Sequence, residues 1–409
     1  MPTAVETNQA IRPIAGGITA PKGFVAAGVH AGIKRQKKDI ALVFSERPCS
    51  AAATFTTNRV KAAPLLVTKE HVEGGPVRAI VVNSGNANAC TGEQGLADAR
   101  RMAAVCAEKL GIRPEEVVVA STGVIGVLLP MDKIEAGIAQ AAAALSVSGA
   151  HDAALGIMTT DTRPKEVAVV CECDGVQFRI GAMAKGSGMI HPNMATMLAF
   201  ITTDAAVERD FLEERLKAAV HVSFNMITVD GDTSTNDMAV VLANGAAPGA
   251  VIEPGTPIAK VFSEALTHVC IELAKMIAAD GEGATKLIEV RVKGAKSNRD
   301  ARLAVKAVAG SSLVKTAVYG EDANWGRILC AVGYSGADFD PEKTTVYLGG
   351  VKVFEHGMGV PFDEQEAKSV LAAEEVAILI DLGEGEGEAT GWTCDLTYDY
   401  VKINASYRT

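Results

Sequence analysis

The chain has 409 residues, of which 48% are hydrophobic and 22% are charged, as is typical of a soluble globular protein. Its formal net charge of −10 argues against a nucleic-acid partner, because phosphate groups are bound by clustered lysine and arginine side chains. No apolar run approaches the roughly 20 residues that a membrane-spanning helix needs, so we expect no membrane partner. The length predicts two domains or three, and small charged metabolites remain compatible as ligands.

The amino-terminal stretch has no apolar core of the signal-peptide type, and Glu6 with a single Arg12 does not suit a transit peptide. We therefore expect a cytoplasmic protein. The eight cysteines are scattered, and most lie within apolar patterns in the manner of structural thiols. Cys171 and Cys173 alternate with Val169 along one predicted strand, and no second ligand pair follows at zinc-binding distance. The sequence thus predicts neither a metal site nor a cofactor.

The amino-terminal part of the chain predicts strands followed by a helix. Residues 38–70 contain three short apolar runs (IALVF, AAATF and PLLV) with polar breaks between them, which suggests strands. A helix is predicted to begin at a capping box of Thr91 and Gln94 and to end at Gly111. Its apolar residues recur at helical spacing, so one face of this helix should pack on a sheet.

The middle of the chain predicts a buried strand, a helix and a hairpin. Residues 117–120 are mostly β-branched and lead into a turn at 121–123, where small side chains leave the backbone open. A helix is expected at about 132–145. Residues 167–180 are typical of a β-hairpin whose turn is Asp174-Gly175, a pair that tolerates positive φ.

Further along, one strand and two helices are expected. Residues 197–201 form an apolar run that suggests a central strand with Thr196 at its leading edge. A helix should follow at roughly 206–220, and the longest amphipathic pattern extends over 257–279 until Gly281 breaks it.

Two glycine-rich segments are not predicted to bind nucleotides. The acidic repeat GEGEGE at 383–388 would repel a pyrophosphate and lacks a strand-to-helix transition, so we expect a solvated hairpin turn. In the segment 181–187 the lysine precedes its glycine, which reverses the order found in a phosphate-binding loop.

Thr196 is the residue whose surroundings suggest chemistry. A threonine hydroxyl is a weak nucleophile until a base lies beside it, and a cut before Thr196 would supply its own α-amine as that base. The unperturbed pKa of such an amine is about 7.7 to 8.0, which suits a general base near neutrality. Taken without further support, a threonine that merely packs in a strand is the commoner explanation.

Six short motifs in a fixed order favour a catalytic Thr196 over a threonine that merely packs. Together they resemble the ornithine acetyltransferase (glutamate N-acetyltransferase) family of arginine biosynthesis, and they extend over nearly the whole chain. The motifs are NSGNANACTG (83–92), STG (121–123), MTTDT (158–162), KGSGMIHPNMATML (185–198), DGEGATK (280–286) and NASYRT (404–409).

The resemblance implies a precursor that cuts itself between Ala195 and Thr196 into chains 1–195 and 196–409. It implies transfer of an acetyl group from N-acetylornithine to glutamate through Thr196, with acetyl-CoA as a further substrate in some members. It also implies an α+β fold of mixed α/β layers, an ArgJ/DmpA-like, Ntn-hydrolase-like sandwich. We expect a catalytic domain at 1–285, a smaller carboxyl-terminal α/β domain at 286–409, and a heterotetramer of two α and two β chains.

The family's functional residues carry over to matching positions. Thr122 and Gly123 correspond to the oxyanion pair, a hydroxyl and a backbone N–H that stabilise a tetrahedral intermediate. A lysine suits the α-carboxylate of an acetylated amino acid and a glutamate suits the ammonium of ornithine, although the resemblance leaves open which charge meets which group. The implied substrate-binding residues are Thr159, Lys185, Thr196, Glu282, Asn404 and Thr409.

Two other functions stay open from the residues alone. One is an amidohydrolase or aminopeptidase that uses the same threonine with water as acceptor, and the other is a non-catalytic amino-acid-binding protein. The α-amine of Thr196 makes a histidine base unnecessary, so His191 and His221 are interpreted as structural. The pairs Asp230/Asp232 and Asp322/Asn324 lie in turns where such side chains bond their own backbone, and no metal is predicted there.

Overall fold

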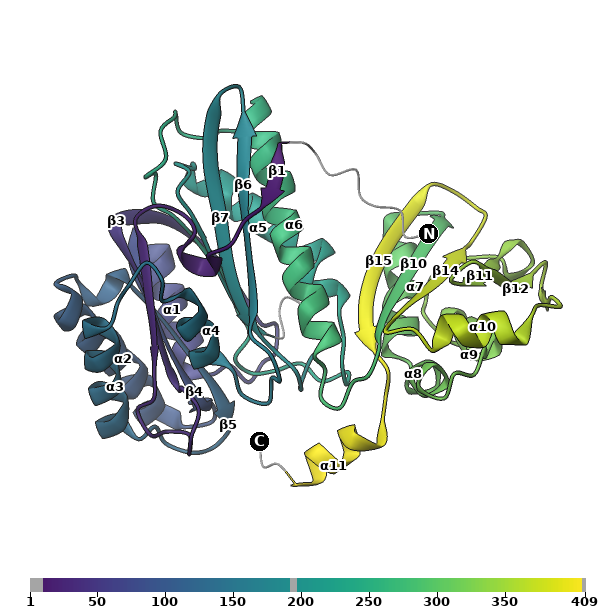
Figure 1. Cartoon of the computed structure of the whole chain (residues 1–409), viewed down its shortest axis with the longest axis horizontal. Helices are drawn as coiled ribbons and strands as arrows, with labels where there is room; N and C mark the ends of the chain where they lie inside the picture. Colours follow the sequence, from purple (N-terminus) through teal and green to yellow (C-terminus); the bar gives the residue numbers. More distant parts are fainter. Residues whose placement is uncertain (1–9, 192–196, 407–409) are drawn as a thin grey trace.

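The structure, a computed structural model, describes residues 10–191 and 197–406 (Figure 1). Within these residues, a first sheet of nine strands has the order β1-β6-β7-β8-β9-β3-β4-β5, and β2 pairs with β3 beside this path. The predicted mixed α+β class is confirmed. The strands are β1 (Ile11–Pro13), β2 (Phe24–Val29), β3 (Ile40–Phe55), β4 (Val77–Asn86), β5 (Val117–Val124), β6 (Lys165–Cys173), β7 (Val176–Lys185), β8 (Leu198–Thr203) and β9 (Met238–Ala243).

The long strand β3 divides this sheet into two halves. Its first part pairs with β2 and β4, whereas residues 50–55 pair with β9. The register shifts between Phe44 and Cys49, and Pro48 in this interval has no N–H to donate to a ladder. The strand therefore belongs to both halves, and the sheet folds back on itself at this point.

The two halves face each other and form the middle of a layered sandwich. Ile80 and Val82 of one half share a buried cluster with Phe200 and Val240 of the other. The alternate residues of the same strands point outward and pack on helices, as Val81 does beside α2. Because both faces are covered, the strands are apolar on both sides, and the predicted sandwich is confirmed.

Helices form the outer layers (Figure 1). Three of them cover the half with β4 and β5: α1 (Ala63–Gly74), α2 (Gly92–Leu110) and α3 (Met131–Ala143). The other half is covered by α5 (Arg209–Val222) and α6 (Pro257–Ala279), and α4 (Ala150–Ile157) packs in the inner cluster. Short 3-10 helices are η1 (Gly17–Thr19), η2 (Pro114–Glu116), η3 (Phe224–Met226) and η4 (Pro341–Lys343).

A second sheet follows α6. In the described residues it has six strands in the order β13-β12-β11-β14-β10-β15. They are β10 (Leu287–Ala295), β11 (Thr345–Leu348), β12 (Val351–Glu355), β13 (Met358–Gly359), β14 (Glu375–Asp381) and β15 (Gly387–Cys394). The accompanying helices are α7 (Asn298–Gly310), α8 (Ser312–Tyr319), α9 (Trp325–Gly333), α10 (Glu364–Leu371) and α11 (Tyr398–Ser406).

One apolar cluster connects the second sheet to the first. It contains Ile277 of α6 together with Ile288 of β10, Val305 of α7 and Trp392 of β15. Because the second sheet begins at Leu287, it follows the predicted boundary at 285/286 closely, and the domain division itself stays a prediction.

Most predicted elements are confirmed. The helix at 257–279 has the predicted bounds in α6. The hairpin consists of β6 and β7, and Asp174 and Gly175 adopt φ of 51° and 77° at its turn. Helix α2 ends at Gly111 with φ of 66° as expected. The helix α4 was not predicted.

The prediction of a strand at the run PLLV is wrong, because residues 63–74 form α1. Pro64 lies in the first turn of this helix, where the missing N–H costs no hydrogen bond. Leu65, Thr68 and Val72 are buried at helical spacing, and Thr68 Oγ1 donates to the carbonyl of Val119 in the edge strand β5 at 2.7 Å. Tertiary packing, which no local pattern reveals, decides the structure here.

Two finer predictions are also wrong. The capping box does not form, because the Thr91 hydroxyl donates to Asn88 Oδ1 at 2.7 Å and Gln94 Nε2 donates to Asp98 at 2.8 Å. The GEGEGE segment is no hairpin turn, because β14 and β15 pair with opposite sides of β10 and the segment must cross the end of that strand. Glu384 is anchored there by Lys343 Nζ at 3.3 Å.

None of the described helices is both long and apolar enough to cross a membrane.

The inner cluster should dominate stability. Replacing the fully buried Phe200 by alanine should lower the free energy of unfolding by about 3–5 kcal/mol, because it removes a large ring and leaves a cavity between the two halves. Chemical denaturation measures the change. Val147→Ala, at a side chain that is 72% exposed, is the control and should have little effect. Equal stability of the two variants would contradict a core formed between the two halves of the sheet.

Candidate active site

The end of β5 carries the predicted oxyanion pair. Here β4 and β5 run parallel, and Gly85 is the partner of Gly123. Gly123 adopts φ of 130°, which favours glycine, and a Cβ atom at this position would lie 2.3 Å from the carbonyl carbon of Gly85. Glycine is therefore required at position 123, next to the Thr122 hydroxyl.

Lys185 reaches the Thr122 hydroxyl from the other half of the sheet. Its Nζ donates to Thr122 Oγ1 at 3.2 Å. Burial lowers the pKa of this ammonium, and the charge of Asp161 opposes the shift. Because an ammonium can only donate, the threonine oxygen accepts from Lys185 and its own hydrogen is left for another acceptor. Lys185 thereby orients Thr122 as a hydrogen-bond donor.

Lys165 is buried between two carboxylates behind this pair. Its Nζ donates to Asp161 Oδ1 at 2.7 Å, to Asp280 Oδ2 at 2.6 Å and to the carbonyl of Arg163 at 3.3 Å. The side chains of Lys165, Asp161 and Asp280 are at most 3% exposed. Burial alone would raise the pKa of Asp161, but the charges of Lys165 and Lys185 hold it well below its usual range. All three ammonium hydrogens have an acceptor.

Asp161 also holds the backbone beside two predicted substrate residues. Its Oδ2 accepts from the N–H of Thr159 at 2.9 Å, and its Oδ1 accepts from the N–H of Gly186 at 2.8 Å. Gly186 follows Lys185 directly, so one carboxylate fixes the approach of both Thr159 and Lys185.

Asp280 and Glu282 are connected to the segment after β7 through Ser187. The Ser187 hydroxyl donates to the carbonyl of Asp280 at 2.7 Å, and the N–H of Glu282 donates to the carbonyl of Ser187 at 3.0 Å. A Cβ atom on Gly188 would lie 2.4 Å from the Glu282 carboxyl carbon, so the chain passes directly over this carboxylate. The segment after β7 and the end of α6 are therefore locked together.

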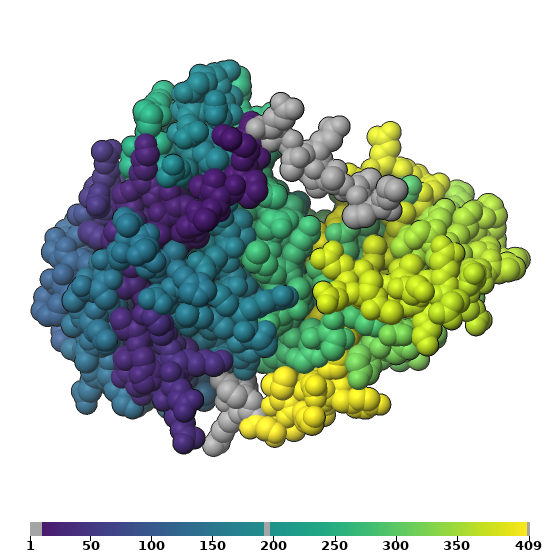
Figure 2. Space-filling view, viewed as in Figure 1, coloured from purple at the N-terminus to yellow at the C-terminus, as the bar shows by residue number. Residues whose placement is uncertain are grey.

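Helix α11 brings the carboxyl-terminal residues to the same place. Asn404 Nδ2 donates to Glu282 Oε2 at 2.8 Å, and Thr397 Oγ1 donates to the carbonyl of Gly283 at 2.7 Å. No described side chain of α11 is buried, and Figure 2 shows the helix as a separate yellow ridge at the lower edge of the molecule. The helix is thus held mainly by polar contacts at the site.

Most predicted site residues that the structure describes converge at this end of the first sheet. Thr122 contacts Lys185, Glu282 contacts Asn404, and the Lys165 network lies between them and beside Thr159. Ala195, Thr196 and Thr409 lie outside the described residues. The next residue, Met197, accepts from the N–H of Met238 at 3.0 Å, and Leu198 pairs with Lys185.

The charged residues that support the site were not predicted from the sequence. Lys165, Asp161 and Asp280 are common surface residue types, and only the fold shows that they are buried together. Asp237 was also missed: it is 3% exposed, burial raises its pKa well above the usual value, and its Oδ2 has no hydrogen-bond partner among the described residues.

Two of the residues interpreted as structural, Asp230 and His191, lie at the turn that follows β7. Asp230 accepts from the N–H groups of Met189 and Ile190 at 2.6 and 2.8 Å. His191 Nδ1 lies 3.0 Å from Thr228 Oγ1. In residues 10–191 and 197–406, no three His, Cys, Asp or Glu side chains are grouped as a metal site requires.

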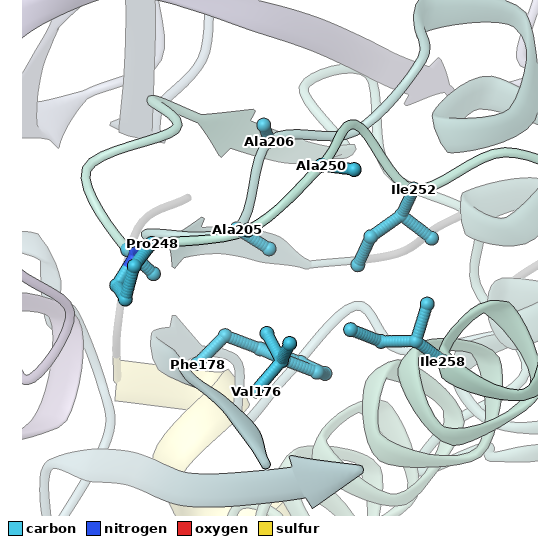
Figure 3. A pocket seen from close by; sticks show the side chains of 10 residues that line it. Val176, Phe178, Ala205, Ala206, Pro248, Ala250, Ile252 and Ile258 are labelled. Carbon is cyan, nitrogen blue, oxygen red and sulfur yellow. The ribbon is translucent and has the colours of Figure 1, made fainter. Parts of the chain in front are cut away.

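An apolar hollow of about 10 Å³ lies elsewhere, at the tip of the β6–β7 hairpin (Figure 3). Val176, Phe178, Ile252 and Ile258 line it, and it has room for about one water molecule. It contains no polar side chain that could orient a ligand, so it is not part of the site.

Comparison with known proteins identifies the family. The model of the ArgJ family matches residues 25–409. The chain belongs to the ArgJ family. The arginine biosynthesis bifunctional protein ArgJ of Symbiobacterium thermophilum is 62% identical over 399 residues, which cover 97% of this chain and 99% of that protein. The predictions of this family and of an acyltransferase of arginine biosynthesis are confirmed.

Solved structures of this family cover part of the chain. The crystal structure of the ArgJ protein of Bacillus halodurans is 49% identical with a TM-score of 0.51, and covers 52% of this chain and 100% of that chain. The ornithine acetyltransferase of Mycobacterium tuberculosis, solved in complex with ornithine, is 46% identical with a TM-score of 0.42, and covers 46% of this chain and 99% of that chain.

The buried ion triad should be essential for folding. Lys165→Met should lower the free energy of unfolding by about 3–5 kcal/mol, because it leaves two buried carboxylates without their counter-charge. Lys260→Met is the control, since the side chain of Lys260 is 80% exposed and pairs with Glu264 one helical turn away at 3.9 Å. Urea denaturation compares the two, and a Lys165→Met protein as stable as the control would refute the role of the triad.

Proposed function

We propose that this protein moves an acetyl group from N2-acetyl-L-ornithine to L-glutamate through an acetyl ester on Thr196. The observation that carries the proposal is the common frame that holds Lys185 beside Thr122 and Glu282 beside Asn404. A cation and an anion at fixed positions beside a hydrogen-bond donor suit an acetylated amino acid with a carboxylate and a side-chain ammonium.

The chemistry begins with the α-amine of Thr196 as general base. It takes the proton of the Thr196 hydroxyl while the oxygen attacks the acetyl carbonyl. The negative charge that develops on the carbonyl oxygen is stabilised by the Thr122 hydroxyl and the Gly123 N–H, a kind of contact worth about 2.7–4 kcal/mol per donor. The C–N bond then breaks, and ornithine leaves with the proton on its α-amine.

The second half reverses these steps with a new amine. The α-amine of glutamate attacks the Thr196 ester, the same donors stabilise the second tetrahedral intermediate, and the proton returns to the threonine oxygen as N-acetylglutamate leaves. Both half-reactions use Thr196, the Thr122 hydroxyl and the Gly123 N–H. One site therefore serves the donor and the acceptor in turn.

Self-cleavage would supply the free α-amine. The Thr196 hydroxyl attacks the Ala195 carbonyl, the peptide becomes an ester, and water hydrolyses it to leave chains 1–195 and 196–409. The segment 196–409 has 409 − 195 = 214 residues, or 52% of the chain, and this equals the share that the solved Bacillus halodurans chain covers. A cut at this bond would give a fragment of that length.

The proposal also covers the assembly of the fragments, their location, a second acetyl donor and the remaining substrate contacts. The two fragments stay associated, and two such pairs form a heterotetramer in the cytoplasm. The bifunctional name of the Symbiobacterium thermophilum relative supports acetyl-CoA as a second acetyl donor. Thr159, Asn404 and Thr409 would contact the substrate beside Lys185 and Glu282.

Loss of the Thr196 hydroxyl should abolish both processing and catalysis. The wild-type protein should give two bands of 195 and 214 residues on a denaturing gel, whereas Thr196→Ala should give one band of 409 residues and no acetyl transfer. Thr316→Ala, at an exposed helix position, is the control and should be processed normally. An active Thr196→Ala protein would exclude the mechanism.

The ester intermediate should be trapped when the acceptor is omitted. Incubation with N-acetylornithine alone should add one acetyl group to the 196–409 fragment, and glutamate should then remove it. Mass spectrometry of the intact fragments measures both steps. Rapid release of acetate without glutamate would instead favour an amidohydrolase, and intersecting initial-rate lines would contradict a ping-pong scheme.

A further inference from the structure

The proposed reaction poses a charge problem at the site. N-acetylornithine carries one carboxylate and a side-chain ammonium, which Lys185 and Glu282 can satisfy. Glutamate carries two carboxylates, and Glu282 would repel the second one. If the proposed function holds, the acceptor needs another cation near Thr122 and Thr159, and none of the predicted substrate residues supplies it.

Lys34 occupies such a position. Its Nζ donates to the carbonyl of Met158 at 2.8 Å, and Met158 precedes Thr159 directly. Its aliphatic stem passes over the oxyanion end of the sheet, because a Cβ atom on Gly85 would lie 2.9 Å from Lys34 Cγ. Gly85 is the strand partner of Gly123. The side chain thus extends from the oxyanion pair to the Thr159 segment.

The segment that carries Lys34 is held in place by a buried carboxylate. Asp39 is fully buried and accepts from the N–H groups of Ala31, Ile33 and Lys34 at 2.5, 2.7 and 2.9 Å. The carbonyl of Asp39 also accepts from Ser84 of β4 at 2.8 Å. The backbone of Lys34 is therefore fixed relative to β4, as a binding residue requires.

We propose that Lys34 is a further substrate-binding residue, which pairs with the side-chain carboxylate of the acceptor glutamate. One of its three ammonium hydrogens bonds to Met158, and no carboxylate forms an ion pair with it among the described residues. A partly desolvated ammonium with free donors favours an incoming carboxylate.

The charge of Lys34 should change in an accessible pH range. Burial lowers its pKa to about 8. The charged groups that act on it are Asp39 and Lys37 from its own segment, Asp161 from the segment after α4, and Lys185 from β7. The aspartates raise the pKa and the lysines lower it. Below about pH 8 the ammonium is charged and binds a carboxylate, and above that pH the attraction is lost.

The test compares glutamate with glutamine, which has the same shape but no side-chain charge. The acetyl-enzyme is first formed from N-acetylornithine, and kcat/KM is then measured for each acceptor. Lys34→Met should lower the preference for glutamate about tenfold or more, as expected for a charge-assisted hydrogen bond, while acetyl-enzyme forms at nearly the wild-type rate. Lys37→Met removes an exposed charge from the same segment and should keep the preference.

A second measurement does not depend on the folding of Lys34→Met. The glutamate-to-glutamine preference of the wild-type protein should fall as the pH rises through about 8, whereas Lys34→Arg should keep a flat preference because its guanidinium stays charged. The ratio cancels the titration of groups that act on both acceptors alike.

Two outcomes would overturn the proposal: an unchanged preference in Lys34→Met, or an equal loss of acetyl-enzyme formation, which would assign Lys34 to the donor step or to folding. A wild-type protein that makes no N-acetylglutamate would instead overturn the proposed function, and this result needs no variant.

Discussion

The arrangement of the site depends on one buried ammonium, that of Lys165 between Asp161 and Asp280. Charges are costly to bury unless they are paired and hydrogen-bonded, and here every ammonium hydrogen has an acceptor while each carboxylate also receives backbone N–H groups. Hydrophobic side chains would pack as well but could not hold three chain segments by their backbones. The triad therefore supplies geometry as well as stability.

This geometry explains why residues far apart in sequence lie together at the candidate site. Thr159, Lys185 and Glu282 each lie within two residues of a group in the network, and each comes from a different segment of the fold. The end of β5 that carries the predicted oxyanion pair is reached by Lys185, whose contact with Thr122 sets the direction of the hydroxyl hydrogen. The charged residues and the predicted oxyanion pair are thus parts of one connected framework.

The sequence predicted the elements with strong periodicity and the motifs with unusual composition. Helix α6 and the β6–β7 hairpin follow from apolar spacing and from an Asp-Gly turn. It failed where tertiary contacts decide, as for α1, whose Thr68 bonds to the edge of β5, and for the segment around Glu384, whose course depends on which strands flank β10.

The candidate site shows the same division. Thr122, Lys185 and Glu282 could be named because they lie in recognisable motifs, whereas Lys165 and Lys34 could not. A lysine in a polar stretch is normally a solvated surface residue. Only the fold reveals that one of these is buried in a triad and that the other reaches across Gly85 toward Met158.

The strand order has a consequence for a protein cut at a single peptide bond. Strands β8 and β9 come after residue 196, yet they lie between β7 and β3, which come before it. Two uninterrupted ladders of main-chain hydrogen bonds would therefore join the severed pieces on both flanks. Separating the two pieces would require breaking both ladders in the middle of the sheet. The cut would therefore create a new chain end without releasing either piece.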